Sequence, residues 1–253
     1  MSTHAGFDYA ALTDAGRVRD HNEDAVTVLP ACGLVVLADG MGGYAAGEVA
    51  SDIAVSVITD VVEQHFLHRP IVPDDLWQVL ADAVLEANTA IIAASLDEPA
   101  YRGMGATLVA GLFHHDRLIV AHVGDSRAYR MRDGLLRPIT RDHSVLQERI
   151  DGGLLTMQEA RGSSIRNLVT RALGVAAELA VEVHEHAVER GDVYLFCSDG
   201  LNDMLDDEEI AHVLLQAAGT LADAGAALVD AANAAGGADN ISVALVGVND
   251  LHS

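Results

Sequence analysis

The sequence contains no lysine, so all 15 of its basic residues are arginine, against 38 acidic residues. The formal net charge is −23 at pH 7. Proteins that bind nucleic acid contact the phosphate backbone through clustered lysine and arginine, so this shortage of positive charge argues against a nucleic-acid partner. The absence of lysine is also what a biased genome composition produces, and by itself it indicates no function.

Cysteine and long apolar runs are also scarce. Only Cys32 and Cys197 are present, both in apolar segments, and their spacing matches neither a disulfide framework nor a zinc site. Both are therefore predicted to be small core residues in a reducing compartment. No run approaches the ~18 uncharged apolar residues of a membrane span, and Met1–His4 does not begin a signal peptide. We expect a soluble, cytoplasmic protein.

Half of the 253 residues are hydrophobic, which is enough for a sizeable core. Nothing in the composition demands two domains. Strand-like segments separated by paired helices, with hairpin turns such as Asp133-Gly134, favour antiparallel sheets covered by helices. A doubly wound parallel sheet is the weaker alternative.

The apolar periodicity places the individual elements. Helices are expected from residue 44 to about 65 and over 74–96, 208–218 and 221–235. Short strands are expected within 7–37, broken by the polar segment 16–24, and over 106–113, 118–124, 126–131, 135–139, 181–187, 193–198 and 241–248. The polar, glycine-punctuated segment 141–174 is expected to be a mobile insert over a site.

Three aspartates stand at the end or edge of apolar segments typical of buried strands: Asp39, Asp199 and Asp239. A carboxylate at the edge of a dry core is costly unless positive charge lies beside it. Oxygen ligands suit Mg²⁺ and Mn²⁺, so the three together indicate a shared divalent cation. Taken singly, each Asp-Gly or Asp-Asn pair is equally explained by a turn that ends a strand.

The arginines are unevenly placed. Ten of the 15 lie between Arg117 and Arg171, where only six acidic residues occur, so this stretch carries a local charge of +4. One interpretation is a surface that meets a phosphorylated or acidic partner. The alternative is compositional chance.

Eight segments together carry a resemblance to a known family. They are Gly16–Asp24, Leu37–Gly43 with Glu48, Gly105–Leu108, His122–Tyr129, Thr140–Ser144, Leu168–Gly174, Cys197–Leu201 and Asp239–Ser242. In this order along nearly the whole chain, they resemble the bacterial branch of the metal-dependent protein serine/threonine phosphatases, the type 2C family.

The resemblance implies one catalytic domain over residues 1–253 and an α+β fold, a four-layer α/β/β/α sandwich. In it, two antiparallel sheets are flanked by helices, and a flap insert occupies about residues 142–179. The implied activity is hydrolysis of phosphoserine and phosphothreonine in proteins by a metal-bridged water. The implied partners are phosphorylated proteins, including a bacterial serine/threonine kinase and its substrates. A monomer without nucleic-acid or membrane partners is expected.

The resemblance also assigns metal ligands for two Mn²⁺ or Mg²⁺ ions. Asp39 would bridge both ions, with the Gly40 carbonyl on one of them and Asp199 and Asp239 on the other. Asp125, together with Asp199, matches the position of a third ion; the alternative is that Asp125 caps a turn. Glu23 is expected to orient metal-bound water from outside the coordination shell.

Arg19 matches the family's substrate-phosphate arginine and, with Asp39, is an expected catalytic residue. Its planar fork can hold two phosphoryl oxygens at once. Arg17 is the alternative, but the spacing to Glu23 favours Arg19.

One departure from the family concerns the leaving group. Animal and plant members carry a histidine, proposed there as the acid, where this chain has Met41, and a thioether cannot donate a proton. Either a metal-bound water or another group would then supply the proton. His21, His122 and His143 are candidates by location, but locally hydrogen-bonded histidines are the more frequent case. His184 and His186 could share a strand face. Without a third ligand nearby in the sequence, a solvated face is favoured over a zinc site.

Two other functions remain open. A catalytically silent domain of the same fold would bind a phosphoprotein or a regulator, although such relatives usually lose metal aspartates that this chain keeps. A phosphatase forming an aspartyl-phosphate generally needs a second aspartate two positions after the nucleophile. That position holds Met41.

Overall fold

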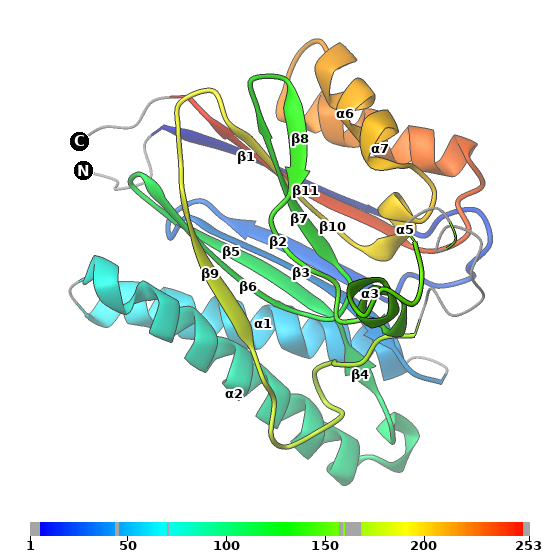
Figure 1. The fold of residues 1–253 in the computed structure, drawn as a ribbon. Coiled ribbons are helices and arrows are strands. Elements are labelled where there is room, and N and C mark those ends of the chain that lie inside the picture. The colour runs from blue at the N-terminus through cyan, green and yellow to red at the C-terminus, as the bar shows by residue number, and fades with distance from the viewer. Residues whose placement is uncertain (1–5, 44–45, 70, 157–158, 160–167, 250–253) are drawn as a thin grey trace.

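The computed structural model describes all residues except 1–5, 44–45, 70, 157–158, 160–167 and 250–253. Its strands form two antiparallel sheets (Figure 1). The first sheet has the order β1 (Phe7–Asp14), β11 (Ile241–Val248), β10 (Val193–Cys197), β7 (Arg127–Arg132) and β8 (Leu135–Pro138). The second has the order β2 (Asp24–Leu29), β3 (Leu34–Met41), β5 (Leu108–His114), β6 (Arg117–Val123) and β9 (Glu182–Ala187), and β4 (Gly105–Ala106) pairs with β3.

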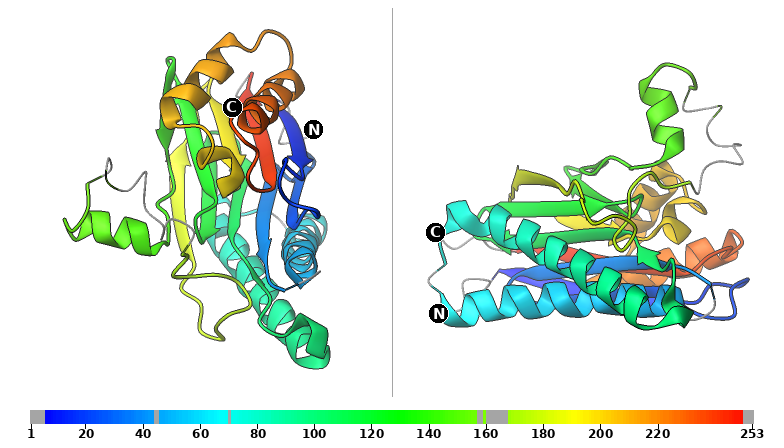
Figure 2. Two further views of the ribbon diagram at one scale, coloured as in Figure 1. Left: turned by 90° about the vertical axis from the view of Figure 1, so that its right-hand side faces the viewer. Right: turned by 90° about the horizontal axis from the view of Figure 1, so that it is seen from below.

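Helices cover the outer faces of both sheets. α1 (Ala46–His68) and α2 (Leu76–Asp97) lie on the second sheet, and α6 (Asp207–Gln216) and α7 (Leu221–Ala234) lie on the first. Figure 2, seen from below, shows α1 and α2 crossing the same face of the second sheet. The shorter helices are η1 (Pro73–Asp75), η2 (Pro99–Tyr101), α3 (Val145–Asp151) and α5 (Asp199–Asn202). The expected four-layer α/β/β/α sandwich is confirmed, and the parallel alternative is wrong.

Strand alternation explains how one strand serves two apolar layers. In β3, Leu34 and Val36 pack toward α1 and α2, whereas Val35 and Leu37 pack between the sheets. All four side chains are fully buried, because a strand covered on both faces has no solvent side. A third apolar cluster joins the first sheet to α6 and α7.

Local sequence signals explain where the last two long helices begin. Asp206 and Glu209 form a reciprocal capping box at the start of α6, and Thr220 and Asp223 form another at the start of α7. Each box satisfies backbone N–H groups that have no partner inside the helix. The expected starts at residues 208 and 221 differ from the observed ones by one residue or none.

One expectation about element limits needs correction. The strand predicted over 106–113 is interrupted at Thr107, whose N–H donates to the Asp39 carbonyl (2.8 Å) and whose hydroxyl bonds Ser126 (2.7 Å). These contacts draw Thr107 out of a regular ladder. The segment 141–174, expected to be a mobile insert, contains α3. Its residues 157–158 and 160–167 lie outside the described part of the chain, and its mobility stays a prediction.

Residues 73–97, which contain α2, are long and apolar enough to span a bilayer by length and composition, and 39% of that window is buried. The buried core helix of a soluble protein passes the same test, and one face of α2 does pack in the core with α1.

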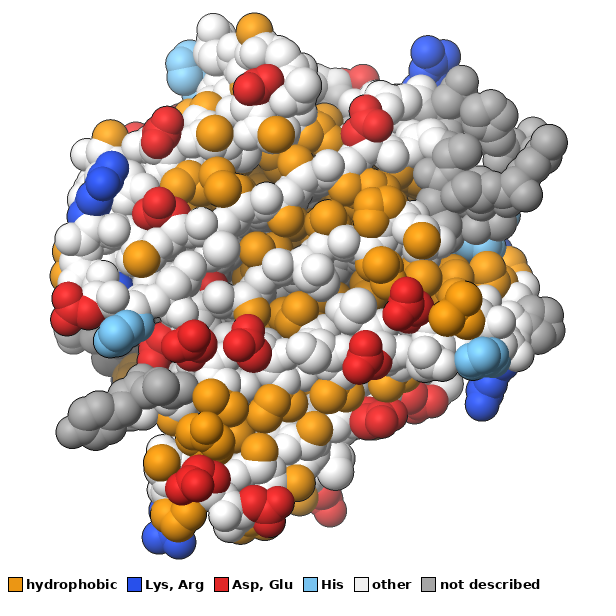
Figure 3. Space-filling view, turned by 180° about the vertical axis from the view of Figure 1, so that it is seen from behind, with side chains coloured by type: hydrophobic (Ala, Val, Ile, Leu, Met, Phe, Trp, Pro, Cys, Tyr) orange, Lys and Arg blue, Asp and Glu red, His pale blue; other side chains and the backbone are white. Residues whose placement is uncertain are grey.

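On the face opposite to that of Figure 1, acidic side chains are scattered among apolar ones and basic side chains are few (Figure 3).

Candidate metal centre

Strand alternation directs Asp39 into the space between the two sheets. Val35 and Leu37 of β3 belong to the inter-sheet core, so Asp39, two residues further along, faces the same way. β2 places Asp24 directly opposite Asp39, and directly opposed residues of antiparallel strands share a face. Two carboxyls of neighbouring strands therefore meet at one end of the interface.

The first sheet supplies two further carboxyls to the same end. β10 and β11 are antiparallel neighbours, so the residue that follows one and the residue that precedes the other lie close together. Asp199 opens α5 two residues after the end of β10, and Asp239 stands two residues before β11. The two sheets are joined here by Ser198, whose hydroxyl donates to Asp24 Oδ2 at 2.7 Å.

The electrostatics show that the carboxyls converge. Burial raises the pKa of Asp39 well above its ordinary value, and four other carboxyls raise it further: Asp24, Asp199, Asp125 and Asp239. Burial likewise raises the pKa of Asp199, and the charges that add to it are those of Asp125, Asp203, Asp239 and Asp24. Like charges around one buried point disfavour ionisation of each.

Asp24 and Asp203 were missed by sequence reasoning as members of this cluster. Burial raises the pKa of Asp24 to about 6, partly offset by hydrogen bonds from serine hydroxyls. Asp24 opens β2, and its register opposite Asp39 was the signal that could have found it. Asp203 stands four residues after Asp199, one helical turn on, and its N–H donates to the Asp199 carbonyl (2.7 Å).

Asp125 follows the end of β6 and is 7% exposed. Burial, followed by repulsion from Asp142 and Asp203, raises its pKa to about 7. Arg127 offsets part of this, but its guanidinium is held by a two-pronged pair with Asp142 (Nε–Oδ1 2.8 Å, Nη2–Oδ2 2.7 Å). The predicted third-ion position is therefore brought into the cluster.

The donor set fits hard divalent cations. Asp24, Asp39, Asp125, Asp199 and Asp239 offer carboxylate oxygens alone, the ligands that Mg²⁺ and Mn²⁺ prefer. Buried carboxyls that repel one another become mutually compatible as anions when divalent charge lies among them. The assignment of individual residues to individual ions stays a prediction.

Arg19 lies beside the cluster. Its Nη2 donates to Asp239 Oδ2 at 2.6 Å, while about half of its side chain is exposed. The hydrogen bond to Asp239 raises the pKa of Arg19, and the charges of Glu23 and Asp199 act in the same direction. Arg17, the alternative, packs against Gly237 through its backbone and stem.

Glu23 and Gly40 are held by close backbone packing. The Gly40 N–H donates to the Glu23 carbonyl (3.0 Å), and the Glu23 N–H donates to Asn240 Oδ1 (2.8 Å). A Cβ added at Gly40 would lie 2.1 Å from the Gly47 carbonyl oxygen, so only glycine fits there. Burial raises the pKa of the Glu23 carboxyl, although the charge of Arg19 opposes the rise.

The candidate leaving-group acids are placed differently from one another. His122 is fully buried, with Nε2 2.9 Å from the Arg141 carbonyl, and His143 is 6% exposed and bonded to Glu182. Neither ring is open to a substrate, whereas His21 is exposed. Met41 Cε lies beside Gly105.

The predicted solvated face on β9 is only partly present. His184 is exposed and its Nε2 lies 2.9 Å from Glu182 Oε1. His186 is half-buried, and its Nε2 has no hydrogen-bond partner among the described residues. The candidate metal-binding group among the described residues is instead His122, His143 and Glu182.

The arginine-rich stretch does not present a uniform positive surface. Arg117 pairs with Asp74 and Glu185, Arg132 with Asp192 and Glu189, and Arg141 with Asp151. Arg161 and Arg166 of the same stretch lie outside the described residues.

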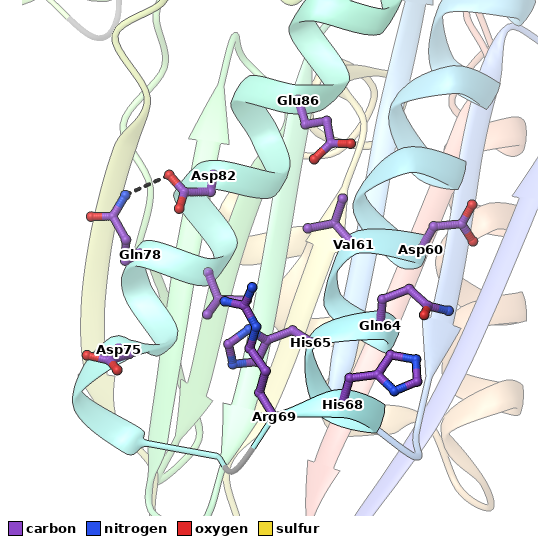
Figure 4. A pocket seen from close by; sticks show the side chains of 11 residues that line it. Asp60, Val61, Gln64, His65, His68, Arg69, Asp75, Gln78, Asp82 and Glu86 are labelled. Carbon is purple, nitrogen blue, oxygen red and sulfur yellow. Dashed lines mark hydrogen bonds between the residues drawn. The ribbon is translucent and has the colours of Figure 1, made fainter.

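A cleft of about 690 Å³ opens between α1 and α2 (Figure 4). Its lining includes Asp60, His68, Asp82 and Glu86, and none of the clustered aspartates takes part. Its acidic side chains spread along two helices without converging on one point.

Comparison with known proteins agrees with this geometry. A family model described as protein phosphatase 2C matches residues 15–241. The serine/threonine protein phosphatase PstP of Mycobacterium tuberculosis is 41% identical over 243 residues, which are 96% of this chain and 45% of the relative. The serine/threonine phosphatase stp of Listeria monocytogenes is 35% identical over 237 residues, 92% of this chain and 93% of the relative. The chain thus spans less than half the length of PstP but most of the Listeria protein.

A solved structure is similar over nearly all of the chain. The catalytic domain of PstP in complex with two manganese ions superposes with a TM-score of 0.86 at 39% identity, covering 97% of this chain and 99% of that one.

Proposed function

The chain belongs to the protein phosphatase 2C family, and we propose that it is a Mn²⁺- or Mg²⁺-dependent phosphatase that hydrolyses phosphoserine and phosphothreonine in proteins. The observation that carries the proposal is the convergence of buried and half-buried aspartates from both sheets at one end of their interface. The relatives that share this fold are named serine/threonine phosphatases, and one of them holds two manganese ions.

Asp39, Asp199 and Asp239 would hold two ions, with the Gly40 carbonyl as a further ligand and Asp125 at a third position. When bound, the ions supply charge neutralisation at the phosphoryl group and activation of the attacking water. Asp39 is fixed for this role because the strands on both sides of it constrain its backbone, with Asp24 opposite and Thr107 bonded to its carbonyl. Glu23 would orient water at the edge of the cluster.

Arg19 would bind the substrate phosphate. Its guanidinium already stands at the cluster through Asp239, and its exposure leaves donors open to an incoming group. A planar fork binds two phosphoryl oxygens and fixes the phosphorus in line with the attacking group. The chain therefore supplies orientation through Arg19 and anionic ligands through its aspartates.

The test compares Asp39→Asn with the wild type in phosphate release from a phosphothreonine peptide under Mn²⁺ titration. Asparagine keeps the shape of the side chain but removes one anionic ligand. Because metal ions contribute several kcal/mol to such reactions, we expect a loss of about 10³-fold or more. Asp82→Asn, on the exposed face of α2 and bonded to Gln78 (2.7 Å), is the matched control and keeps full activity. Turnover by Asp39→Asn within tenfold of the wild type would refute the assignment.

A catalytically silent domain has no observation in its favour, because every predicted metal aspartate is present in the cluster. Calorimetric Mn²⁺ titration beside the same phosphate assay separates the two functions. Stoichiometric binding without any turnover would favour the silent domain.

We also propose the wider setting. The chain would act as one catalytic domain over residues 1–253, with a flap at about 142–179, as a cytoplasmic monomer that opposes a bacterial serine/threonine kinase. The net charge of −23 supports the absence of a nucleic-acid partner, and the packing of α2 against α1 supports the absence of a membrane span. Sedimentation of the purified chain and fractionation of cells that express it test these points.

A further inference from the structure

Gly124, the residue before Asp125, forms hydrogen bonds to His143 through both its N–H and its carbonyl. The His143 N–H donates to the Gly124 carbonyl (2.8 Å), and the Gly124 N–H donates to His143 Nδ1 (3.2 Å). Gly124 has φ +104°, and a Cβ there would lie 2.6 Å from Thr107 Cβ. The backbone that sets the direction of Asp125 is therefore in a conformation that favours glycine, and His143 takes both of its hydrogen-bonding groups.

The hydrogen bonds also determine the tautomer of His143. Nδ1 accepts from a backbone N–H, so in the neutral ring Nε2 carries the proton. That nitrogen lies 2.8 Å from Glu182 Oε2 and donates to it. The bond to His143 lowers the pKa of Glu182 to about 2, which makes Glu182 an anionic acceptor. Glu182 thus holds the ring with its lone pair toward Gly124.

His143 also joins this loop to the base of the flap. Its carbonyl accepts from the Thr170 N–H (2.7 Å), and the next residue, Ser144, forms a bridge with Val169. Glu182 is the first residue of β9, where the chain re-enters the second sheet. His143 therefore connects three parts of the chain: its backbone and ring hold Gly124, its carbonyl holds Thr170, and its ring bonds Glu182 at the start of the edge strand.

A metal site formed by His122, His143 and Glu182 is the competing interpretation, since one ligand atom of each lies within 4.8 Å of the others. The two imidazole rings are stacked, with centroids 4.6 Å apart and planes 15° from parallel. A cation bound by an imidazole nitrogen lies in the plane of the ring, and two nearly parallel planes do not meet beside their rings. Arg171 Nη1 also lies 3.3 Å from His143 Nε2. Because both nitrogens carry hydrogen in this tautomer, they form no hydrogen bond, and the guanidinium charge would repel a cation bound there.

We propose that His143, oriented by Glu182, is the positioning residue for Asp125: by holding the Gly124 peptide it directs the Asp125 carboxylate toward Asp199. Among the neighbouring charges that raise the pKa of Asp199, that of Asp125 contributes most, as expected for two carboxyls that lie close together. The consequence is that the affinity of the third ion depends on a histidine that does not touch it. This inference rests on the proposed function only for its metal measurement.

Two substitutions at one position separate the contacts of His143. In His143→Asn the amide oxygen replaces Nδ1 and keeps the acceptor for Gly124, but the bond to Glu182 is lost. In His143→Gln the amide nitrogen approaches the place of Nε2 and keeps the donor to Glu182, but the acceptor for Gly124 is lost. His184→Ala is the matched control, because His184 bonds the other oxygen of Glu182 from the exposed side.

The first measurement is equilibrium Mn²⁺ binding by electron paramagnetic resonance, which counts free ions and does not depend on turnover. Asp125→Asn identifies the Mn²⁺ site that depends on Asp125, because this variant loses it. At that site we expect His143→Gln to lower the Mn²⁺ affinity by about 5- to 10-fold, as the loss of one hydrogen bond predicts. His143→Asn should stay within about threefold of the wild type, and His184→Ala should be unchanged. On the Asp125→Asn background His143→Gln should have no further effect, because the coupling runs through Asp125.

The second measurement is hydrogen exchange of the Gly124 amide in the metal-free protein. Exchange should accelerate in His143→Gln and stay near the wild-type rate in His143→Asn. If His143→Gln does not fold, Glu182→Gln provides the test, with a smaller change in the same direction.

Equal Mn²⁺ affinity and equal Gly124 exchange in His143→Gln and the wild type would overturn the proposal. So would the same loss in His143→Asn as in His143→Gln, because the acceptor would then not matter. The proposal would also be overturned if Asp125→Asn bound as many Mn²⁺ ions as the wild type. If the wild type bound no Mn²⁺ at all, the proposed function would be refuted. The Gly124 exchange rates would still decide whether His143 holds the Gly124 peptide.

Discussion

Replacing Asp125 by asparagine should stabilise the metal-free protein at alkaline pH. Asp125 is 7% exposed, and burial with repulsion from Asp142 and Asp203 raises its pKa to about 7. The same carboxyl in the unfolded chain titrates near its ordinary value of about 3.9. One pKa unit corresponds to ~1.4 kcal/mol, so ionising Asp125 in the folded state costs about 4 kcal/mol.

The sign follows from proton linkage. The folded protein binds the Asp125 proton more tightly than the unfolded chain does, so this contribution to stability is complete below about pH 4 and is lost as the pH rises through about 7. Asparagine does not ionise and avoids the loss. The stability of Asp125→Asn relative to the wild type should therefore grow by about 3 kcal/mol between pH 5 and pH 8.

Thermal unfolding in the presence of a chelator measures this difference. For a chain of this size, about 3 kcal/mol corresponds to a change of roughly 6–12 °C in the Tm gap between variant and wild type. Asp82→Asn should show the same gap at both pH values, because Asp82 is exposed. Saturating Mn²⁺ should reduce or reverse the advantage of Asp125→Asn, since only the wild type gains stability from an ion at that position.

A Tm gap that is equal at pH 5 and pH 8 would refute the reasoning. A metal-free Asp125→Asn protein that is less stable than the wild type at pH 8 would refute it too. Either result would mean that the Asp125 carboxylate is already compensated within the chain.

Three further predictions concern other parts of the molecule. Arg19→Ala should lower kcat/KM for a phosphopeptide by about 10- to 100-fold, as the loss of charge-assisted hydrogen bonds to phosphate predicts. Arg17→Ala should change kcat/KM less than about threefold. Equal effects of the two substitutions would contradict the assignment of Arg19. Gly40→Ala should lower the free energy of unfolding by about 3 kcal/mol or more, because its Cβ would meet a backbone oxygen at 2.1 Å; chemical denaturation measures this, and an unchanged midpoint would show that the backbone adapts. Arg132→Ala should cost about 3–5 kcal/mol, because it leaves the buried carboxylate of Asp192 without its two-pronged partner (2.6 and 2.7 Å). Burial acts to raise the pKa of Asp192, but the bonds from Arg132 and neighbouring groups lower it overall. The loss of unfolding free energy in Arg132→Ala should therefore shrink as the pH falls below about 4. A loss that is independent of pH would contradict this.

Much of the fold could be predicted because local patterns and the global fold agree. Apolar periodicity predicted α1 and α2 to within a few residues, and the capping residues of α6 and α7 stand directly before those helices. The short strand β4 could not be predicted, since it depends on pairing with the end of β3. The break at Thr107 could not be predicted either, since it depends on hydrogen bonds to Asp39 and Ser126, residues distant in the sequence.

The candidate site was partly predicted. Asp39, Asp199, Asp239 and Asp125 were recognised by their motifs, and the structure brings them together. Asp24 was missed because nothing in its own neighbourhood distinguishes it from a turn residue; only the register of β2 against β3 places it opposite Asp39.

The sequence by itself determined the chemistry that is available: carboxylates at strand ends, an arginine near one of them, and no lysine. It also determined the long helices and most of the strands, because periodicity and capping act over a few residues. The tertiary structure alone decided which carboxylates come together at one end of the sheet interface, and that His143 bonds both the N–H and the carbonyl of Gly124. Those outcomes depend on strand register and on the direction of hydrogen bonds between residues far apart in the chain, and no local pattern encodes either.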